Sequence, residues 1–315
     1  MNVFEYLGLG ADHRVYPVML VKHREEVPKS KLFFPVYGQV KRDGVFSLLI
    51  VLGGKAAFFG RTGLAFVNTE ALAEKLQCLP NGAYMGELLT SAPAELAELS
   101  GVVNPSRVKE LDWHGEAIKK GLYVDLYDFL PLKYFIEGGC QTGYLKRHAA
   151  LCKRVPTELI EGGYCNVLPY TQLNNEQEVE DFANRCIAEG EEGAVFKVDC
   201  DYEAGHKGWR QTKKVREVTF DLTCVGWEEG KGKYKGKVAN LVFKWTDGKT
   251  IKAMLGKGWT HEDAEQMFND IKNGGELNVI GRIFQVYGLQ ESSKGKIRNP
   301  KVGEMRHDKG EPDVY

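Results

Sequence analysis

The sequence predicts an α+β protein made of two domains. Its 315 residues are long enough to bury two cores. Short apolar runs of strand length and amphipathic helical segments are mixed up to about residue 217, and strand-like runs with a single helix follow. We therefore expect one domain over residues 1–217 and a second over residues 218–315.

The first domain is predicted from apolar periodicity. Runs bounded by turn residues indicate strands, several of them buried, at 36–40, 46–52, 56–59, 122–126 and 194–198. Helical spacing predicts helices at 71–76, 95–99, 144–153 and 176–188. In the last of these, Asn174 or Asn175 can cap the amino terminus, and Val179, Phe182 and Cys186 share one face.

The second domain has a different pattern. Strand-like runs cover 218–225, 238–244, 250–254 and 277–286, and only one helix, near 261–272, interrupts them. About five short strands and one helix in roughly 100 residues are typical of a small β-barrel of the OB kind. No segment rich in proline or serine separates the two parts, so we expect a short hinge.

Composition limits the possible classes. The net charge is -1, so any affinity for nucleic acid must come from local patches. The seven cysteines are scattered without a CxxC pair, which favours reduced thiols. No run of 18 apolar residues occurs, and the amino terminus lacks the order of a signal peptide. These features predict a cytoplasmic protein that does not enter a membrane.

The sharpest local motif is QVKRDG at residues 39–44, which leaves a predicted strand. A lysine amine can attack the α-phosphate of a nucleotide when burial or neighbouring cations leave it partly neutral. Lys41 and Asp43 are two residues apart and so share a face while the chain is extended. Taken alone, the motif is equally compatible with a surface Lys–Asp turn.

Six further motifs follow in order: GRTG at 60–63, YMGELL at 84–89, LYVDLYDFLPL at 122–132, EGAVFK at 192–197, KVR at 214–216 and RHDK at 306–309. With KRDG, this series resembles the ordered motifs of the covalent nucleotidyltransferases, which comprise DNA ligases, RNA ligases and capping guanylyltransferases. The resemblance implies a nucleotidyltransferase (adenylation) domain of mostly antiparallel sheets with packed helices, followed by an OB-fold barrel.

The resemblance also implies roles for single residues. Lys41 would be the nucleophile, Tyr127 would stack on adenine, Glu87 would contact the ribose and Lys197 the α-phosphate. Asp43 and Glu192 would hold Mg²⁺. The full set expected to bind ATP is Gln39, Arg61, Glu87, Tyr127, Lys197, Lys214, Arg216, Arg306 and Lys309.

Two departures from the family pattern and one geometric point leave questions open. Phe46 stands where an arginine is common, and the residue that replaces it is not evident. Arg216 stands in place of a lysine, so Lys213 and Lys214 are an alternative pair. Glu192 and Lys197 are five apart, on opposite faces of a flat strand, unless Gly193 bends its start.

The carboxyl-terminal domain resembles that of DNA ligases, in the stretch VGWEEGKGKYKGKVANLVFKWTDGKTIKAMLGKGW and in the closing KIRNPKVGEMRHDK. In the segment KGKYKGK at residues 231–237, lysines alternate with glycine or tyrosine, so an extended chain would present these lysines together to the DNA backbone. The residues expected to bind DNA are Lys231, Lys233, Lys235, Lys237, Lys296, Arg298 and Arg61.

We therefore expect a monomeric ATP-dependent DNA ligase that seals 5′-phosphate/3′-hydroxyl nicks in duplex DNA through lysyl-AMP and DNA-adenylate. The KRDG motif begins at residue 41, so we expect a compact enzyme that resembles the bacteriophage type and would act in the host cytoplasm. Two alternatives remain. One is an RNA ligase or a capping-type guanylyltransferase, and the other is an inactive nucleotidyltransferase scaffold that only holds nucleic acid.

Overall fold

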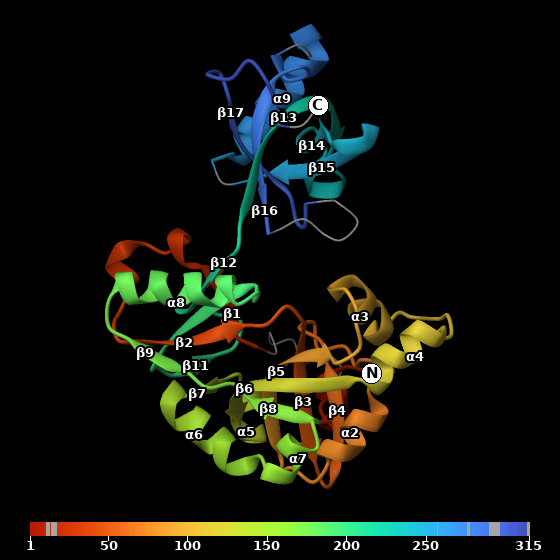
Figure 1. Cartoon of the computed structure of the whole chain (residues 1–315), viewed down its shortest axis with the longest axis vertical. Helices are drawn as coiled ribbons and strands as arrows, with labels where there is room; N and C mark the ends of the chain where they lie inside the picture. The colour runs from red at the N-terminus through yellow and green to blue at the C-terminus, as the bar shows by residue number, and fades with distance from the viewer. Residues whose placement is uncertain (11–12, 14–17, 257, 276–277, 290–296, 314–315) are drawn as a thin grey trace. The chain divides into compact units, whose positions relative to one another are not determined.

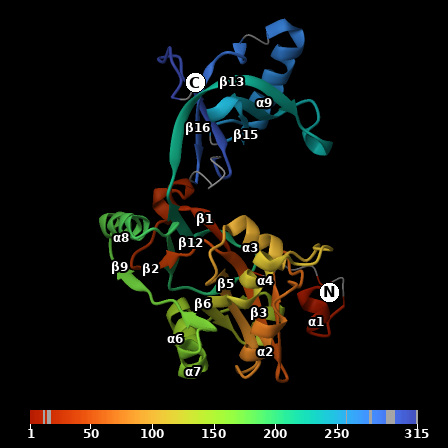
Figure 2. The ribbon, with the colours of Figure 1, turned by 45° about the vertical axis from the view of Figure 1, so that its right-hand side comes forward.

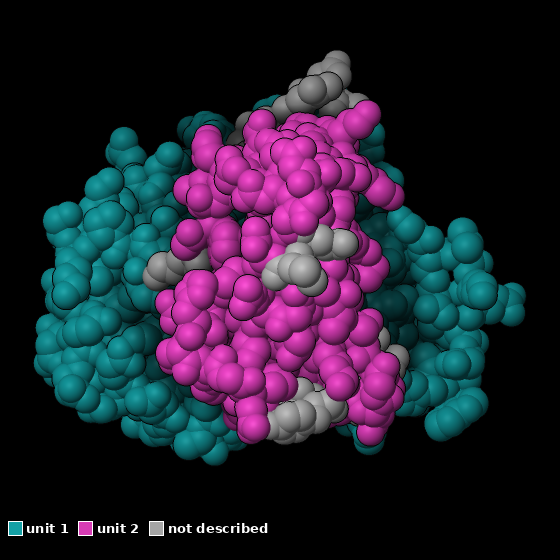
Figure 3. Space-filling view, turned by 90° about the horizontal axis from the view of Figure 1, so that it is seen from above, with its two compact units in different colours: residues 1–215 teal, residues 216–315 magenta. Residues whose placement is uncertain are grey.

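The structure is a computed structural model that describes residues 1–10, 13, 18–256, 258–275, 278–289 and 297–313. The chain divides into two compact units, Met1–Val215 and Arg216–Tyr315, coloured separately in Figure 3. This division falls two residues before the boundary expected from the sequence.

The first unit contains two five-stranded sheets. The first sheet has the order β1-β12-β10-β2-β9, with β1 Leu20–His23, β12 Lys207–Val215, β10 Gly193–Val198, β2 Val36–Lys41 and β9 Thr171–Leu173. The second has the order β4-β3-β5-β6-β8, with β4 Lys55–Phe59, β3 Val45–Leu52, β5 Gly82–Thr90, β6 Leu122–Leu130 and β8 Cys165–Val167. Residues 42–44 connect β2 to β3, so the chain passes from one sheet to the other there.

Helices cover these sheets (Figures 1 and 2). They are α1 Val3–Tyr6, α2 Glu70–Leu76, α3 Leu96–Val103, α4 Trp113–Lys120, α5 Leu132–Glu137, α6 Tyr144–Arg154, α7 Thr157–Glu161 and α8 Glu176–Ala188. Helix α8 has the predicted bounds, and the Asn175 side chain caps it by accepting from the Glu178 backbone amide at 2.9 Å. A short pair, β7 Gly139–Cys140 and β11 Tyr202–Glu203, completes the unit.

The burial of the two sheets differs. In the second sheet, Leu49 and Val51 pack in one hydrophobic cluster while Leu48 and Ile50 pack in another, so both faces are covered. In the first sheet, Val36 and its neighbours form an apolar face that packs against α8. Its other face carries polar side chains, and the candidate site lies there.

The second unit is a closed five-stranded barrel of order β13-β14-β15-β17-β16. The strands are β13 Val218–Glu229, β14 Val238–Lys244, β15 Thr250–Leu255, β16 Ile283–Gly288 and β17 Lys301–Met305, with α9 at His261–Asp270. The α+β class with a terminal barrel is as predicted. The strand expected at 277–286 begins only at Ile283, because residues 278–281 form turns in which Gly281 has a φ of 82°.

Among the described residues, no helix is both long and apolar enough to cross a membrane. All seven cysteines are free thiols.

Candidate active site

A cavity opens within the first unit, and charged, polar and aromatic side chains line it. Both sheets contribute to its wall. Its lining includes Gln39, Lys41, Val195, Lys197 and Gln211 from the first sheet, Phe46, Glu87 and Tyr127 from the second, and Val18–Val21, Arg42, Arg61 and Leu168. Six of the residues expected to bind ATP or to act as nucleophile therefore meet in one place.

Lys41 faces the cavity because side chains alternate along β2. Val36 and Val40 pack toward α8, while Gln39 and Lys41 lie on the opposite face. The Lys41 Nζ lies 2.5 Å from Glu192 Oε2, and both side chains are largely buried. The carboxylate is thus placed to hold the amine and to accept its proton.

Glu192 reaches this face because of Gly193. Gly193 pairs with Lys41 across the sheet and has a φ of 151°, which side chains rarely adopt. A Cβ atom there would lie 2.2 Å from the Lys214 carbonyl oxygen. Only glycine fits at this position. The bend at Gly193 brings Glu192 beside Lys41. Lys197, five residues after Glu192, also lines the cavity, so the two side chains lie on the same side of the strand despite their odd spacing.

Lys197 is 2% exposed and lies against aromatic rings. Its Nζ donates to the Tyr127 carbonyl at 3.1 Å and is 4.3 Å from the centre of the Tyr127 ring and 4.6 Å from that of Tyr144. Burial lowers the pKa of Lys197 to about 7, although Asp128 opposes the shift. Its charge is therefore sensitive to pH near neutrality.

Gln39 carries an unused acceptor. Its side chain is 2% exposed, and its Nε2 donates to the Leu168 carbonyl at 2.9 Å, which fixes the orientation of the amide. Its Oε1 is buried without a partner among the described residues. Buried polar atoms are nearly always satisfied, so this oxygen indicates a ligand that donates a hydrogen bond.

Glu87, Arg61 and Phe46 form another part of the wall. Burial raises the pKa of Glu87 to about 7, against the opposing effect of Lys41. Phe46 pairs with Glu87 across the sheet, and the Arg61 guanidinium lies 5.7 Å from the centre of its ring. Where an arginine is common in the family, this chain thus places an aromatic ring that contacts Arg61.

The lysines of β12 correct one interpretation of the sequence. Lys214 lies opposite Ala194, on the face covered by α8, and forms an ion pair with Glu180 of that helix. Lys213 lies opposite Val195, which lines the cavity, and its pKa is lowered by burial and then by Lys41. Strand alternation therefore directs Lys213 rather than Lys214 toward the site. Arg216 lies in the connection between β12 and β13.

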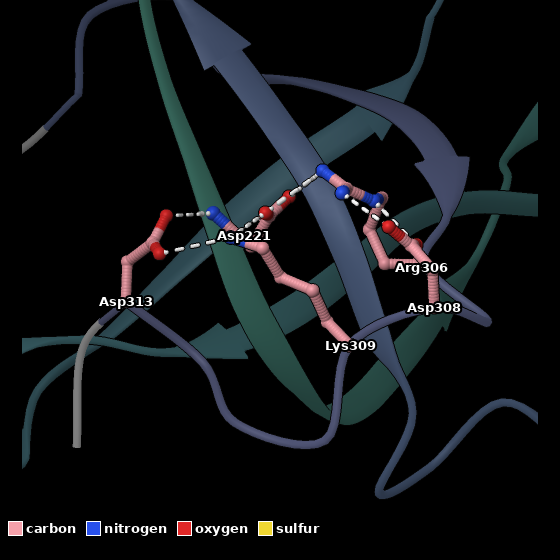
Figure 4. A network of polar contacts seen from close by, with 5 residues as sticks. All are labelled: Asp221, Arg306, Asp308, Lys309 and Asp313. Atoms are coloured by element: carbon pink, nitrogen blue, oxygen red, sulfur yellow. Dashed lines mark hydrogen bonds and ion pairs between the residues drawn. The ribbon is translucent and has the colours of Figure 1, made fainter.

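In the second unit, Arg306 and Lys309 lie in a network of carboxylates (Figure 4). Arg306 pairs with Asp221 at 2.9 Å and with Asp308 at 2.7 Å, and Lys309 pairs with Asp221 and, at 3.3 Å, with Asp313. Two cations thus face three carboxylates. The sequence contained no local signal for Asp221, which is 85 positions from Arg306.

The expected extended row of lysines is wrong. Residues Gly232–Tyr234 form a 3₁₀ turn, and glycines 232 and 236 have φ values of 59° and 79°. Lys237 points to α9, where it pairs with Glu265 at 2.5 Å. Lys231, Lys233 and Lys235 belong to this turn rather than to a strand. Arg298 lies just before β17, and Lys296 lies outside the described residues.

Metal-binding capacity depends on few groups. Asp43 lies in the 42–44 connection, and Glu192 is paired with Lys41. The described part of the chain has no cluster of three or more His, Cys, Asp or Glu side chains that could hold an ion. Mg²⁺ commonly keeps waters and uses one or two carboxylates with substrate phosphates, so the donors present fit an ion shared with a nucleotide.

Next to Lys41, Arg42 has partners to which the sequence motifs assign no role. Asp125 of β6 and Glu191 before β10 both bind Arg42, and Asn166 of β8 binds Asp125. In the sequence, only the position of Arg42 inside KRDG pointed to this group of residues, because Asp125, Glu191 and Asn166 are distant from Arg42 in the chain.

Known proteins resemble parts of this chain in sequence. Residues 229–306 match the family model of the DNA ligase OB-like domain. DNA ligases of Saccharolobus islandicus and Saccharolobus solfataricus are each 35% identical over 96 residues, a match that covers 28% of this chain. The chain spans only 16% of the length of these relatives.

Solved structures resemble the whole chain. Pmar-Lig_PreS3 matches with a TM-score of 0.73 and 19% identity over 93% of this chain and 68% of that one. A Lig E DNA ligase gives a TM-score of 0.66 at 14% identity, covering 92% of this chain and 98% of that one. The ATP-dependent DNA ligase of bacteriophage T7 gives 0.55 at 17% identity, covering 92% and 99%. The chain thus has the fold of solved DNA ligases such as that of bacteriophage T7, and its residues 229–306 match the DNA ligase OB-like domain.

Proposed function

We propose that the chain is an ATP-dependent DNA ligase that seals nicks in duplex DNA. The observation that carries the proposal is the convergence on one cavity of Lys41, Tyr127 and Gln39. Lys41 is paired with Glu192, and Gln39 has a buried oxygen without a partner among the described residues. A nucleophilic amine, an aromatic platform and a buried acceptor are the groups that a transfer of AMP to lysine requires.

In the first step, the Lys41 amine attacks the α-phosphate of ATP. A phosphorus–nitrogen bond forms, the bond to pyrophosphate breaks, and Glu192 is placed to take the proton of the amine. Lys197, Lys213 and Arg61 supply positive charge for the phosphates. Bound Mg²⁺ would add charge neutralisation, held by Glu192 and Asp43 together with phosphate oxygens.

In the second step, the 5′-phosphate of the nick attacks the AMP phosphorus and releases Lys41. In the third, the 3′-hydroxyl attacks the activated 5′-phosphate, the phosphodiester forms and AMP leaves. The DNA substrate is inferred from residues 229–306, which match the DNA ligase OB-like domain.

The Gln39 oxygen supports adenine over guanine. Adenine carries an amino group that can donate to this acceptor, whereas guanine carries a carbonyl oxygen at the equivalent ring position. An acceptor facing an acceptor leaves both unpaired, which costs roughly 1–3 kcal/mol.

The test is incubation with α-labelled ATP or GTP and magnesium, then denaturing electrophoresis and mapping of the label. We expect ATP to label Lys41, Lys41→Ala and Lys41→Arg to remain unlabelled, and wild type to seal nicked DNA far faster than nicked RNA. Label on Lys41→Ala, a preference for GTP, or faster sealing of RNA would contradict the proposal.

A further inference from the structure

The nucleophile stands at the junction of the two sheets. Strand β2 of the first sheet ends at Lys41, and β3 of the second begins at Val45. The intervening turn packs tightly, because a Cβ atom on Gly44 would lie 2.6 Å from the Leu88 carbonyl oxygen. The direction of the Lys41 side chain therefore depends on how firmly the two sheets are joined at this point.

Arg42 makes that join. Its Nε donates to Asp125 Oδ2 at 2.8 Å, and its Nη1 pairs with Glu191. Asp125 lies in β6 of the second sheet with its side chain 1% exposed, and its other oxygen accepts from Asn166 Nδ2 at 2.8 Å. Glu191 lies just before β10 of the first sheet. These contacts form the Arg42 cluster, which consists of Arg42, Asp125, Glu191 and Asn166.

The Arg42 cluster runs beside the reactive pair. Lys41 binds Glu192 and the next residue, Arg42, binds the preceding residue, Glu191, so two adjacent ion pairs connect the same two segments. A displacement of Glu191 must therefore move Glu192. A guanidinium suits this task, because its planar donors hold two carboxylates in a fixed geometry.

We propose that Arg42 is a positioning residue for the adenylylation of Lys41. It acts through Asp125 and Glu191, which fix the turn after Lys41 and the segment that carries Glu192. This inference rests on the proposed function, and it assigns Arg42 no contact with the nucleotide although the residue lines the cavity.

The kinetic test is single-turnover adenylylation of the full chain over a range of ATP concentrations. For Arg42→Ala we expect the rate at saturating ATP to fall about 100-fold, because a small misplacement of reacting groups has effects of this size. The ATP concentration for half-maximal rate should change less than about threefold. A large increase in that concentration with an unchanged saturating rate would overturn the proposal in favour of direct nucleotide binding.

Matched variants separate geometry from charge. Arg42→Lys keeps the charge but loses the fixed fork, so its rate should fall between those of wild type and Arg42→Ala. Arg210→Ala is the control, because Arg210 also bridges two carboxylates, Asp201 and Glu203, in the same unit without lining the cavity. Its saturating rate should stay within about twofold of wild type. An equal loss in Arg210→Ala would show a general effect and overturn the proposal.

A double variant separates positioning from stability. Arg42→Ala leaves the buried Asp125 carboxylate without its cation, which destabilises the fold. Adding Asp125→Asn removes that charge, so the double variant should regain much of the melting temperature and still adenylylate slowly. Recovery of the rate together with the melting temperature would contradict a positioning role.

Amide hydrogen exchange supplies a readout that needs no turnover. We expect residues 41–44 to exchange faster in Arg42→Ala than in wild type or Arg210→Ala. If wild type formed no adenylate, the proposed function would fail, while the exchange would still decide whether Arg42 holds this segment. Unchanged exchange in Arg42→Ala would overturn the positioning role.

Discussion

At the scale of single residues, the side-chain direction on each strand decides which cations can reach the nucleotide. Adjacent lysines of β12 point to opposite faces, so Lys213 shares the electrostatic environment of Lys41 while Lys214 pairs with Glu180. Neighbours in sequence therefore have separate tasks, and exchanging one for the other should not restore function.

The two lysines give a direct test. Lys213→Ala should slow adenylylation at least about tenfold, since it removes a cation from the phosphate site. Lys214→Ala removes only a partly exposed ion pair and should cost no more than about 1 kcal/mol of stability, with little change in rate. Adenylylation rates and melting curves measured together would check this, and a rate loss confined to Lys214→Ala would refute it.

We expect Lys197 to make ATP binding sensitive to pH. Its folded pKa of about 7 lies below the ordinary value of 10.5, so the ammonium is lost as pH rises through 7. We expect the affinity of Lys41→Ala for ATP, a background without chemistry, to weaken from pH 6 to pH 8. Lys197→Gln should bind weakly at every pH. Calorimetry would show this, and an unchanged pH profile in Lys197→Gln would exclude Lys197 as its source.

The lowered pKa of Lys197 also makes the stability of the fold depend on pH, and here a higher pH is favourable. Between about pH 7 and 10.5 the unfolded chain binds the Lys197 proton and the folded chain does not, so the contribution of this group to stability rises with pH. A bound phosphate should stabilise the charged form of the Lys197 amine and so raise its pKa. Proton uptake on ATP binding near pH 7 follows from the same reasoning.

At the scale of elements, the turn between β13 and β14 replaces the expected row of cations. Glycines 232 and 236 adopt positive φ values, which fold the chain back and separate the lysines. Lys237 is drawn to α9 by Glu265, whereas Lys233 lies over the Tyr234 ring, 5.0 Å from its centre. The turn therefore presents fewer cations than its sequence contains.

The salt dependence of nick binding should show how many lysines of this turn contact the DNA backbone. Changing Lys233 and Lys235 to Ala should spare adenylylation and weaken nick binding. It should also flatten the plot of log affinity against log salt by about 0.9 for each phosphate that is no longer neutralised. Lys249→Ala, which removes a lysine from another turn of the barrel, is the control and should leave the slope unchanged. Equal slopes in all three proteins would remove this turn from the DNA surface.

At the scale of the whole molecule, we expect the two units to contribute to different steps of the proposed reaction. The sequence resemblance implies that Arg306 and Lys309 bind ATP, yet in the structure both pair with carboxylates around the buried Asp221. Contact with ATP would require these cations to exchange partners. The energetic competition between carboxylates and phosphates should then set the rate of the first step.

Arg306 tests this division of labour. Arg306→Ala should slow sealing from ATP much more than sealing of a nick that is already adenylylated, because only the former releases pyrophosphate. Arg306→Lys controls for the loss of charge beside Asp221. Equal losses on both substrates, together with a lower melting temperature, would indicate a structural role for Arg306 in the barrel instead.

The sequence alone determined those features whose cause is local. Apolar periodicity placed α8 and β14, and the strand count in the last hundred residues predicted the barrel that closes the chain. It missed β5, whose burial along most of its length removes the alternation and whose two glycines weaken the strand pattern. It also missed β17, a short strand within a motif interpreted only by its charges.

The tertiary structure decided what depends on register and on distant partners. Strand pairing, not spacing, selected Lys213 over Lys214, and a bend at Gly193 brought Glu192 to Lys41. Arg42 and Asp125 are 83 positions apart, so their pairing leaves no periodic trace in the sequence. Alternation along one strand is a property of neighbouring residues, whereas ion-pair partners are set by the packing of sheets, which requires the whole fold.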